Sequence, residues 1–455
     1  MNKTTKKSTN KKQVEFIIVN PDAAGIDISA TMHAVAVPPG RDTEQVRMFG
    51  AFTEDLQSIA TWLNECGVTT VAMESTGVYW KPLFSVLVEQ GFEVYLVNAQ
   101  HVKNITGRKT DMDDAQWIQK LHSCALLKTS FLPDNETETL RTIVRYRRSL
   151  TEDSSRYLLR MEKALELMNI KIHSTISDIM GKTGKAIIEA ILQGEREAGN
   201  FIQYVDPRIK APQSEIIKSL QGTWRQEHLF TLKNSYDLYN CVQQKIEACN
   251  KQIEILLEQM AAIQHEGLIE EIPAFPPNTS PARHKKKAKN QPTFNVGEYL
   301  KKMHGVDVTE IYGISEISAL QILSETGTDL SKWEDAKHFI SWLNLCPNNK
   351  ITGGKLISSK LLKKKSNAAT QAFRSAANSL RVSENWLGDY FRRKKAKGGH
   401  KYAIVATARK IALIYYLMVR NKKEFSPVDL GEYRKRYTES KIAYLEKQLA
   451  KLKAA

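Results

Sequence analysis

Short apolar segments alternate with segments of helical periodicity over the first third of the chain. Segments rich in Val, Ile and Phe that are broken by Pro, Gly and Ser predict strands, and apolar residues three and four apart predict helices. The predicted strands are residues 14–19, 24–28, 33–37, 46–52, 69–73 and 94–97. The predicted helices are residues 53–66, residues 78–90 and one that starts within residues 109–115. This alternation predicts an α/β domain with helices packed on a mixed sheet.

The middle of the chain shows a different helical periodicity. Two series of apolar residues are spaced alternately three and four apart, which is typical of the seam of a coiled coil. The first series is Leu158, Met161, Leu165, Met168 and Ile172, and the second is Tyr239, Val242, Ile246, Cys249, Ile253, Leu256 and Met260. The two stretches pair either within one chain as an antiparallel hairpin or between two chains as a dimer interface, and the spacing leaves both arrangements open.

A break in this periodicity separates the helical region from the C-terminal part. Residues 273–292 are rich in proline and include a basic run at residues 283–287, which predicts a linker along nucleic-acid backbone. Beyond it the pattern is mainly α-helical. The expected domains are a disordered basic arm (1–12), an α/β domain (13–132), a helical coiled-coil region (133–272), a basic linker (273–300), a C-terminal domain (301–425) and a helical tail (426–455).

Charge narrows the class of partner. The chain has 455 residues, with 66 Lys and Arg against 50 Asp and Glu, a formal net charge of +16. This excess favours a polyanionic partner such as nucleic acid. No run of eighteen apolar residues spans a bilayer, and the N-terminus lacks the apolar segment of a signal peptide, so we expect a cytoplasmic protein with no membrane contact. The five cysteines lack the spacing of a zinc site.

Acidic residues stand at the ends of the predicted strands and at the start of a predicted helix. Asp27 lies in the first strand region, Glu74 follows a later strand, and Asp111 and Asp114 are three apart in K-T-D-M-D-D-A. Residues at i and i+3 share a helix face, so Asp111 and Asp114 project together while Asp113 points elsewhere. Taken singly, these acids are a turn former, a surface acid and an acidic helix start.

Taken together, the acids predict a metal centre. Carboxylates this close repel and raise each other's pKa, so such a set normally holds hard divalent cations. Two Mg²⁺ ions about 3.5 to 4 Å apart activate a nucleophile and stabilise the leaving oxygen of a phosphodiester. We therefore expect Mg²⁺, as two ions and with Mn²⁺ as the alternative metal. The ligands, called the DEDD acids below, are Asp27, Glu74, Asp111 and Asp114.

A second candidate site lies in N-N-K-I-T-G-G-K-L-I-S-S-K at residues 348–360. Gly353 and Gly354 make a flexible backbone that can approach phosphate closely. A hydroxyl there could attack a phosphodiester and form a covalent protein–DNA intermediate once a base or metal removes its proton. By composition alone the segment also fits an ordinary turn. The interleaved lysines that offset phosphate charge are Lys350, Lys355 and Lys360.

Three motifs follow one another in the N-terminal domain: G-I-D-I-S at residues 25–29, A-M-E-S-T-G at residues 72–77 and K-T-D-M-D-D-A at residues 109–115. In order and spacing they resemble the RuvC-like DEDD domain of transposases of the insertion-sequence 110 family, with which Piv-type DNA invertases are grouped. The resemblance implies a RuvC/RNase H-like fold and a catalytic role for the DEDD acids. Lys109 leads into the last acid pair and is a candidate nucleic-acid contact.

The C-terminal domain also resembles that family, which has a G-L-C-P-like segment, a Ser-Gly-Gly-Lys turn and an Ala-rich helix. The counterparts here are residues 344–347, 352–355 and 367–380. The family's nucleophile is a serine, and Thr352 stands where serine is usual. The extra methyl of threonine restricts χ1 and crowds the attacking oxygen, so Ser358 and Ser359 are alternative nucleophiles, and an impaired copy is a third interpretation. Further candidate nucleic-acid contacts are Arg374, Arg392 and Arg393.

The resemblance extends over roughly residues 25–418 and implies a transposase or DNA recombinase. Such an enzyme cleaves and rejoins strands through a Mg-dependent DEDD site and a covalent hydroxyl–DNA intermediate. It also implies donor and target DNA, a structured noncoding bridge RNA, a dimer or tetramer, and a bacterial or archaeal cell whose nucleoid the protein joins when acting. The alternatives are a RuvC-like nuclease that uses metal-activated water, a Piv-like invertase, and a non-catalytic nucleic-acid-binding remnant.

Overall fold

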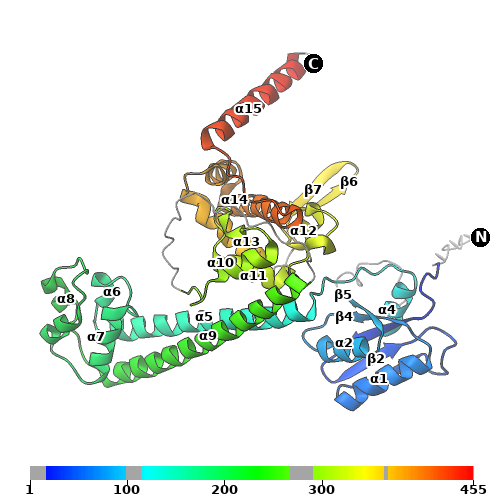
Figure 1. The fold of residues 1–455 in the computed structure, drawn as a ribbon, viewed down its shortest axis with the longest axis horizontal. Helices are drawn as coiled ribbons and strands as arrows, with labels where there is room; N and C mark the ends of the chain where they lie inside the picture. The colour runs from blue at the N-terminus through cyan, green and yellow to red at the C-terminus, as the bar shows by residue number, and fades with distance from the viewer. Residues whose placement is uncertain (1–16, 99–113, 267–289, 363–366, 454–455) are drawn as a thin grey trace, which may run out of the picture. The chain divides into compact units, whose positions relative to one another are not determined.

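A computed structural model of the chain describes residues 17–98, 114–266, 290–362 and 367–453. Within it the chain forms two compact units, residues 1–132 and 133–455. The N-terminal unit is built on a five-stranded sheet in the order β3-β2-β1-β4-β5 (Figure 1). Its strands are β1 (Ala23–Ile28), β2 (Met32–Ala36), β3 (Val46–Gly50), β4 (Thr70–Glu74) and β5 (Glu93–Val97). β1, β2 and β3 pair antiparallel, whereas β1, β4 and β5 pair parallel.

Helices cover both faces of this sheet. α1 (Thr53–Glu65) and α2 (Trp80–Glu89) pack on one face, where their buried leucines meet Ile26 of β1 and Met73 of β4. α4 (Asp114–Ser123) packs on the other face, where Trp117 and Ile118 meet Ala72 of β4. This mixed α/β layer is consistent with the predicted RuvC-like domain.

The strand expected at residues 14–19 is wrong for the three residues that the structure describes. Ile17, Ile18 and Val19 are 83%, 66% and 58% exposed and belong to no strand. The amides of Val19 and Asn20 both donate to the carbonyl of Ser123 at 2.8 Å, which ties this segment to the end of α4. β-Branched composition favours a strand only where a neighbouring strand is there to pair with it.

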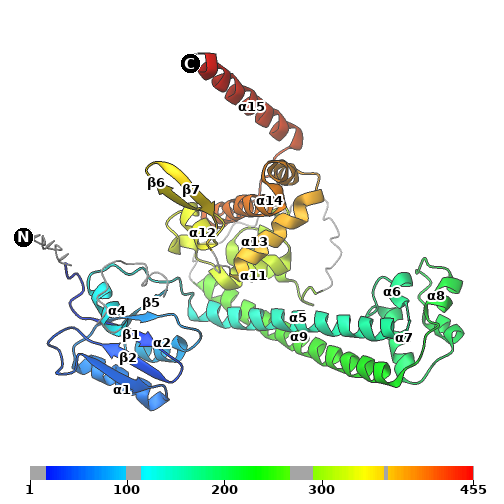
Figure 2. The same ribbon diagram turned by 180° about the vertical axis from the view of Figure 1, so that it is seen from behind.

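Two long helices, α5 (Asn135–Leu167) and α9 (Gln226–Glu266), run side by side and antiparallel within the chain (Figures 1 and 2). Arg147 Nε donates to Asn250 Oδ1 at 2.6 Å, and Gln243 Nε2 donates to Ser154 Oγ at 2.7 Å, so later residues of α5 meet earlier residues of α9. The structure therefore has the pairing within one chain. The supercoiled packing of a coiled coil stays a prediction.

The apolar seams differ from the expected ones in two places. α5 ends before Ile172, which belongs to the separate helix α6 (Ile172–Thr175). In the second seam Leu257 is fully buried, whereas Leu256 is only partly buried. A step of four residues from Ile253 fits the helical period as well as a step of three, so spacing alone did not distinguish the two leucines.

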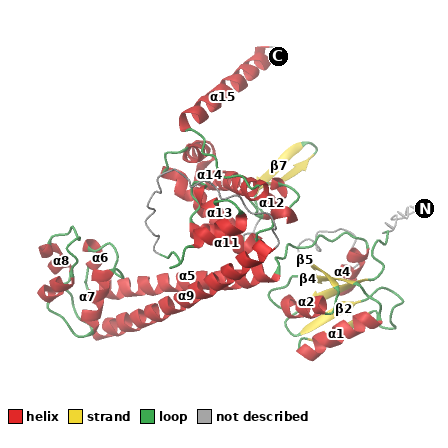
Figure 3. Ribbon diagram, viewed as in Figure 1, coloured by secondary structure: helices red, strands yellow, loops and turns green. Residues whose placement is uncertain are grey.

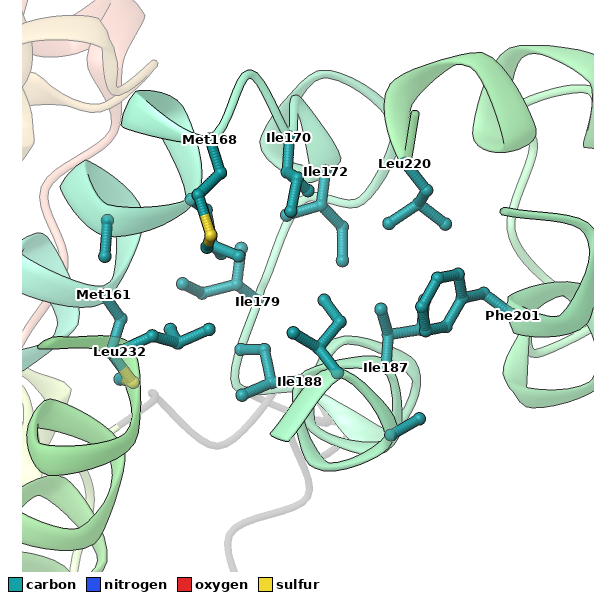
Figure 4. Close-up of a cluster of buried hydrophobic side chains, with 14 of the residues drawn as sticks. Met161, Met168, Ile170, Ile172, Ile179, Ile187, Ile188, Phe201, Leu220 and Leu232 are labelled. Carbon is teal, nitrogen blue, oxygen red and sulfur yellow. The ribbon is translucent and has the colours of Figure 1, made fainter. Parts of the chain in front are cut away.

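A small helical cluster closes the far end of the α5–α9 pair. Its elements are α6, α7 (Lys182–Leu192), η1 (Ala198–Tyr204) and α8 (Gln213–Ser219). Figure 4 shows the side chains of Met161 and Leu232 from the long helices together with Ile188 of α7 and Phe201 of η1. Burial of these side chains fixes the end of the helical pair, since each contributes on the order of 1.5–3 kcal/mol.

The C-terminal part is mainly helical, as expected. Its elements are α10 (Val296–His304), η2 (Val308–Glu310), α11 (Glu316–Thr326), η3 (Leu330–Lys332), α12 (Ala336–Trp342), β6 (Asn348–Thr352), β7 (Lys355–Lys360), α13 (Ala368–Ser379), η4 (Leu380–Val382), α14 (Trp386–Asn421) and α15 (Leu430–Lys453). Its core joins Phe339 of α12, Phe373 of α13 and Tyr415 of α14, all fully buried. The ring of Phe373 packs edge-on to Tyr415, with centroids 5.6 Å apart.

Helix α14 is the longest apolar element of this part. One eighteen-residue stretch of it is long and apolar enough to cross a membrane by length and composition, and half of that stretch is buried inside the protein. Ile411, Tyr415 and Val419 within it contribute to the core. A core helix therefore accounts for its apolar composition.

Candidate functional site

Two of the DEDD acids stand next to each other at one end of the sheet. β1 and β4 are parallel neighbours, with Gly25 opposite Ala72. Two further steps of this register set Asp27 beside Glu74, on strands that are about 4.8 Å apart. Both acids are partly exposed where their neighbours are buried. The strand ends therefore present two carboxylates at the same edge.

α4, which begins at Asp114, packs directly on β1 at Gly25. A Cβ atom at Gly25 would lie 2.1 Å from the Gln119 amide nitrogen and 2.5 Å from the Ala115 carbonyl oxygen. Asp114 is the first residue of α4 and immediately precedes Ala115. Side chains alternate along a strand, so Asp27 projects from the same face of β1 as Gly25, the face that α4 covers.

Glu74 lies on that face as well, because Ala72, two residues before it, packs against α4. The turn after β4 orients its carboxylate: the Thr76 hydroxyl donates to Glu74 Oε1 at 3.1 Å. Gly77 completes the turn with a φ of 54°, in the left-handed region that favours glycine. Asp27 and Glu74 thus share one face and one edge of the sheet, and α4, which begins at Asp114, covers that face.

The histidine on β2 does not offset the charge of these acids. His33 on β2 is 2% exposed, and burial lowers its pKa, while the nearby carboxylates of Asp27 and Asp55 act in the opposite direction. Its imidazole is therefore neutral near pH 7. The negative charge at this edge favours a cation, since carboxylates that share a site repel one another.

The donor set fits a hard divalent cation in kind, because Asp27, Glu74 and Asp114 supply only carboxylate oxygens. Among the residues that the structure describes, no group of three or more His, Cys, Asp or Glu side chains is gathered closely enough to hold an ion. Asp111, the fourth acid, and Lys109 lie outside the described residues. Strand register therefore sets two acids side by side, and α4 begins at a third, without completing a ligand set.

The second candidate site, expected as a flexible turn, is the β6–β7 hairpin. Gly353 and Gly354 form its two-residue turn with φ values of 54° and 73°. A type I′ turn requires positive φ at both of these positions, which accounts for the glycine pair. Thr352 pairs with Lys355 beside the turn and is exposed. The hairpin stands out from the helices around it (Figure 3).

Cross-strand register distinguishes the two alternative serines. Ser358 is opposite Lys350, whereas Ser359 is opposite Asn349 and donates to its Oδ1 at 2.8 Å. The register shifts by one residue at Ile357, which has no partner on β6. Lys350 and Thr352 are two residues apart on β6 and share a face, so Ser358, opposite Lys350, lies on the face of Thr352 and Ser359 on the opposite one. By the same pairing, the lysines on the face of Thr352 are Lys350, Lys355 and Lys360.

The three candidate arginines have different surroundings. The Arg393 guanidinium lies against two tyrosines of α15, 4.7 Å from the ring centre of Tyr433 and 3.7 Å from that of Tyr437. The side chain of Arg392 is 41% exposed and that of Arg393 only 25%. Arg374 is partly buried on α13. Contact of these arginines with nucleic acid stays a prediction.

Several residues that position these sites were not identified from the sequence. Gly25 permits the close packing of α4, and Asn349 holds the hydroxyl of Ser359. A glycine inside a strand commonly marks a close backbone approach. Gly25 lies two residues before Asp27, so the sequence could have indicated a close contact at this position. Nothing in the sequence indicated the role of Asn349, because its hydrogen-bond partner depends on the register of the hairpin.

Two family models match the chain. The model DEDD_Tnp_IS110, described as a transposase, matches residues 24–170, which include β1, β4 and α4. The model described as the transposase IS116/IS110/IS902 family matches residues 307–392, which include the hairpin and Thr352. Together the matches cover about half of the chain. No curated protein matches the sequence.

Proposed function

Because this chain belongs to the IS110 family of transposases, we propose that it is a DNA recombinase that cleaves and rejoins strands through a covalent protein–DNA intermediate. In this proposal the DEDD acids hold Mg²⁺ at a phosphodiester, and Thr352 supplies the nucleophile. One observation supports it: the β1–β4 register sets Asp27 beside Glu74, on the face where α4, which begins at Asp114, packs on Gly25.

The proposed cleavage is a transesterification. The Thr352 hydroxyl oxygen forms a bond to phosphorus while the bond from phosphorus to one nucleoside oxygen breaks, and the hydroxyl proton ends on the leaving oxygen. Bound divalent cations would neutralise phosphate charge and activate the attacking oxygen. The lysines on the face of Thr352 bind neighbouring phosphates and orient the strand. Rejoining is the reverse step, with the hydroxyl of another strand as nucleophile.

The hairpin geometry ranks the three candidate nucleophiles. Thr352 is exposed beside the turn and shares its face with three lysines. Ser358 shares that face but is partly buried, and Ser359 points to the other face with its hydroxyl donated to Asn349. We therefore propose Thr352 as the nucleophile, with Ser358 as the second candidate.

Three alanine variants of the full chain test this assignment, namely Thr352→Ala, Ser358→Ala and Ser359→Ala. Each is mixed with labelled donor DNA and Mg²⁺, and the protease-sensitive protein–DNA adduct is quantified. We expect Thr352→Ala alone to abolish the adduct, and Thr352→Ser to keep it because a hydroxyl remains. Undiminished cleavage by all three alanine variants would instead assign the protein to the nucleases that use metal-activated water.

The acids are tested separately. Asp27→Asn and Glu74→Gln keep the size of each side chain but remove a negative charge, so we expect strand cleavage to fall by about 10²- to 10³-fold, as for other groups that stabilise transition-state charge. Glu89→Gln, at the C-terminal end of α2, is the matched control. Wild-type cleavage rates for both acid variants would refute the catalytic role of these acids. An unsubstituted chain that binds DNA and yields no cleaved product would instead favour the non-catalytic nucleic-acid-binding interpretation.

We further propose that the protein acts as a dimer or tetramer on donor and target DNA with a structured guide RNA. The net charge of +16 supports a polyanionic partner and does not distinguish RNA from DNA. RNase treatment of the purified protein before DNA is added should abolish strand exchange, and adding back the extracted RNA should restore it. Strand exchange that is insensitive to RNase would refute the guide.

A further inference from the structure

Helix α15 (Leu430–Lys453) carries an apolar stripe that is exposed to solvent. Its four members are 50%, 53%, 54% and 77% exposed in chain order, and nothing in the described part of the chain covers them. They are spaced three, four and three residues apart, the spacing of positions a and d in a coiled coil. The stripe consists of Ile442, Leu445, Leu449 and Leu452.

We propose that α15 forms a parallel two-stranded coiled coil with α15 of a second copy of this chain. The first apolar a–d pair, β-branched Ile442 followed by Leu445, is the combination typical of parallel dimers, and the next pair is Leu449 with Leu452. Thr438 occupies the preceding d position and extends the seam by one layer.

The charges that flank the stripe select both the partner and its direction. With Ile442 at a, Lys441 occupies position g and Glu446 the following position e. In a parallel dimer g of one helix faces the following e of the other, so Lys441 of each copy meets Glu446 of its mate. Arg434 occupies the g position one heptad earlier and already pairs with Asp389 of its own chain at 3.2 Å, so the charge argument rests on Lys441 and Glu446. In an antiparallel dimer the e positions of the two helices face each other, and Glu446 of one copy would then stand near a glutamate of the other.

Two features extend the argument beyond the seam. Lys441 and Glu446 are exposed, so they are available to a partner. α15 follows α14 in the chain, and the Arg393 guanidinium lies on Tyr433 and Tyr437 near the start of α15. A parallel coil therefore places the α14 helices of both copies at the same end. This inference does not depend on the proposed chemistry.

Direction is tested by cysteine cross-linking in the full chain. In a parallel, in-register coil the two copies of residue 438 face each other, so Thr438→Cys should form an intermolecular disulfide under mild oxidation. The unsubstituted chain gives the background from its native cysteines. A second variant, Ser440→Cys, places the thiol at the outer position f and should not exceed that background.

Strength is tested by sedimentation of the full chain over a range of concentrations. Leu445→Glu places a charge in the seam and should raise the dimer dissociation constant by about 100-fold or more, as expected when a core leucine is lost from both copies. Tyr444→Ala, which removes a 61% exposed side chain off the stripe, is the matched control and should leave it unchanged. Circular dichroism checks that each variant keeps its helix content.

Charge reversal supplies the sharpest readout. Lys441→Glu should weaken the dimer, and adding Glu446→Lys to it should restore the dimer because each pair is again complementary. Absence of the residue-438 cross-link, a dissociation constant unaffected by Leu445→Glu, or a double reversal that fails to rescue would each overturn the proposal. A cross-link that forms only in the presence of DNA or RNA would assign α15 to nucleic-acid binding and overturn it as well.

Discussion

Replacing Gly25 with alanine tests whether the packing of α4 on β1 positions the acids. The added Cβ would stand 2.1 Å from the Gln119 nitrogen and 2.5 Å from the Ala115 oxygen. Both atoms belong to backbone, so no side chain can rotate away. Ordinary contacts of this kind need at least about 3.4 Å, and α4 must therefore retreat from β1 by on the order of 1 Å.

Two consequences follow from that displacement. Overpacking of a buried contact costs about 1–3 kcal/mol of unfolding free energy. Asp114 moves with α4 relative to Asp27, and a misplacement of about 1 Å at a reacting centre costs on the order of 10²-fold in rate. Gly25→Ala should therefore speed amide hydrogen exchange in α4 and slow Mg²⁺-dependent DNA cleavage, while the α5–α9 pair exchanges as before.

The matched control is Gly199→Ala, because no atom stands within 4 Å of a Cβ built at Gly199. Hydrogen exchange followed by mass spectrometry reports on α4 and on η1 in the same sample. Cleavage is measured at saturating Mg²⁺, where weaker metal binding no longer lowers the rate. A rate that stays low there reports a misplaced carboxylate. If Gly25→Ala and Gly199→Ala behave alike in both assays, α4 does not rest on Gly25 and the proposed convergence of the acids fails.

Three further predictions concern other contacts. Glu325 of α11 is 2% exposed and accepts from Arg145 Nε and Nη2 of α5 at 2.8 Å, and the Arg145 side chain is 53% exposed. Glu325→Ala should therefore lower the free energy of unfolding of the C-terminal unit by about 1.5–3 kcal/mol, the range for hydrogen bonds to charged groups, as measured by thermal unfolding, whereas exposed Glu334→Ala should not. Burial lowers the pKa of His122 to about 4, so the unfolded state binds more protons between pH 6.5 and 4, and the N-terminal unit should lose up to about 3 kcal/mol as pH falls through that window. A His122→Gln variant with the same pH dependence would contradict this. Asn344→Ala should lower adduct yield without changing the melting temperature of the N-terminal unit, because the Asn344 side chain holds the backbone of Leu362 just beyond β7 through two hydrogen bonds of 3.0 and 3.2 Å.

The strands that carry Asp27 and Glu74, and the helices α1 and α2 that pack on them, were predictable because both faces of the sheet are buried. Apolar runs led to β1 and β4, and helical spacing led to α1 and α2, within a few residues at each end. The order of the acids along the chain followed from the same runs. The apolar runs did not predict which strands are neighbours. Asp27 and Glu74 become adjacent only through the parallel pairing of β1 with β4.

The C-terminal site was less predictable because its geometry depends on backbone conformation. Glycines beside hydroxyl residues indicated flexibility, yet the Gly353-Gly354 pair has the positive φ values of a tight hairpin turn. Once the register is known, Ser358 and Ser359 separate onto opposite faces. Asn344 also has a positive φ, 51°, as the two turn glycines do. Asparagine is among the few residues other than glycine that adopt this conformation readily.

The two candidate sites differ in how firmly the fold holds them, and this difference constrains the proposed reaction. Asp27 and Glu74 sit on hydrogen-bonded neighbours in the middle of a covered sheet, so their separation is set by the backbone ladder. Thr352 stands beside the turn of a hairpin whose residues are exposed apart from the partly buried Ser358. Packing within the protein does not align the Thr352 hydroxyl, because the hairpin is exposed. Its alignment with the scissile phosphate must therefore come from the nucleic acid that the hairpin binds. The lysines on the face of Thr352 provide that contact, because phosphates bound between them fix the hairpin and the scissile strand together. Loss of one of these lysines should therefore reduce the rate of adduct formation at saturating DNA, and not only the affinity for DNA.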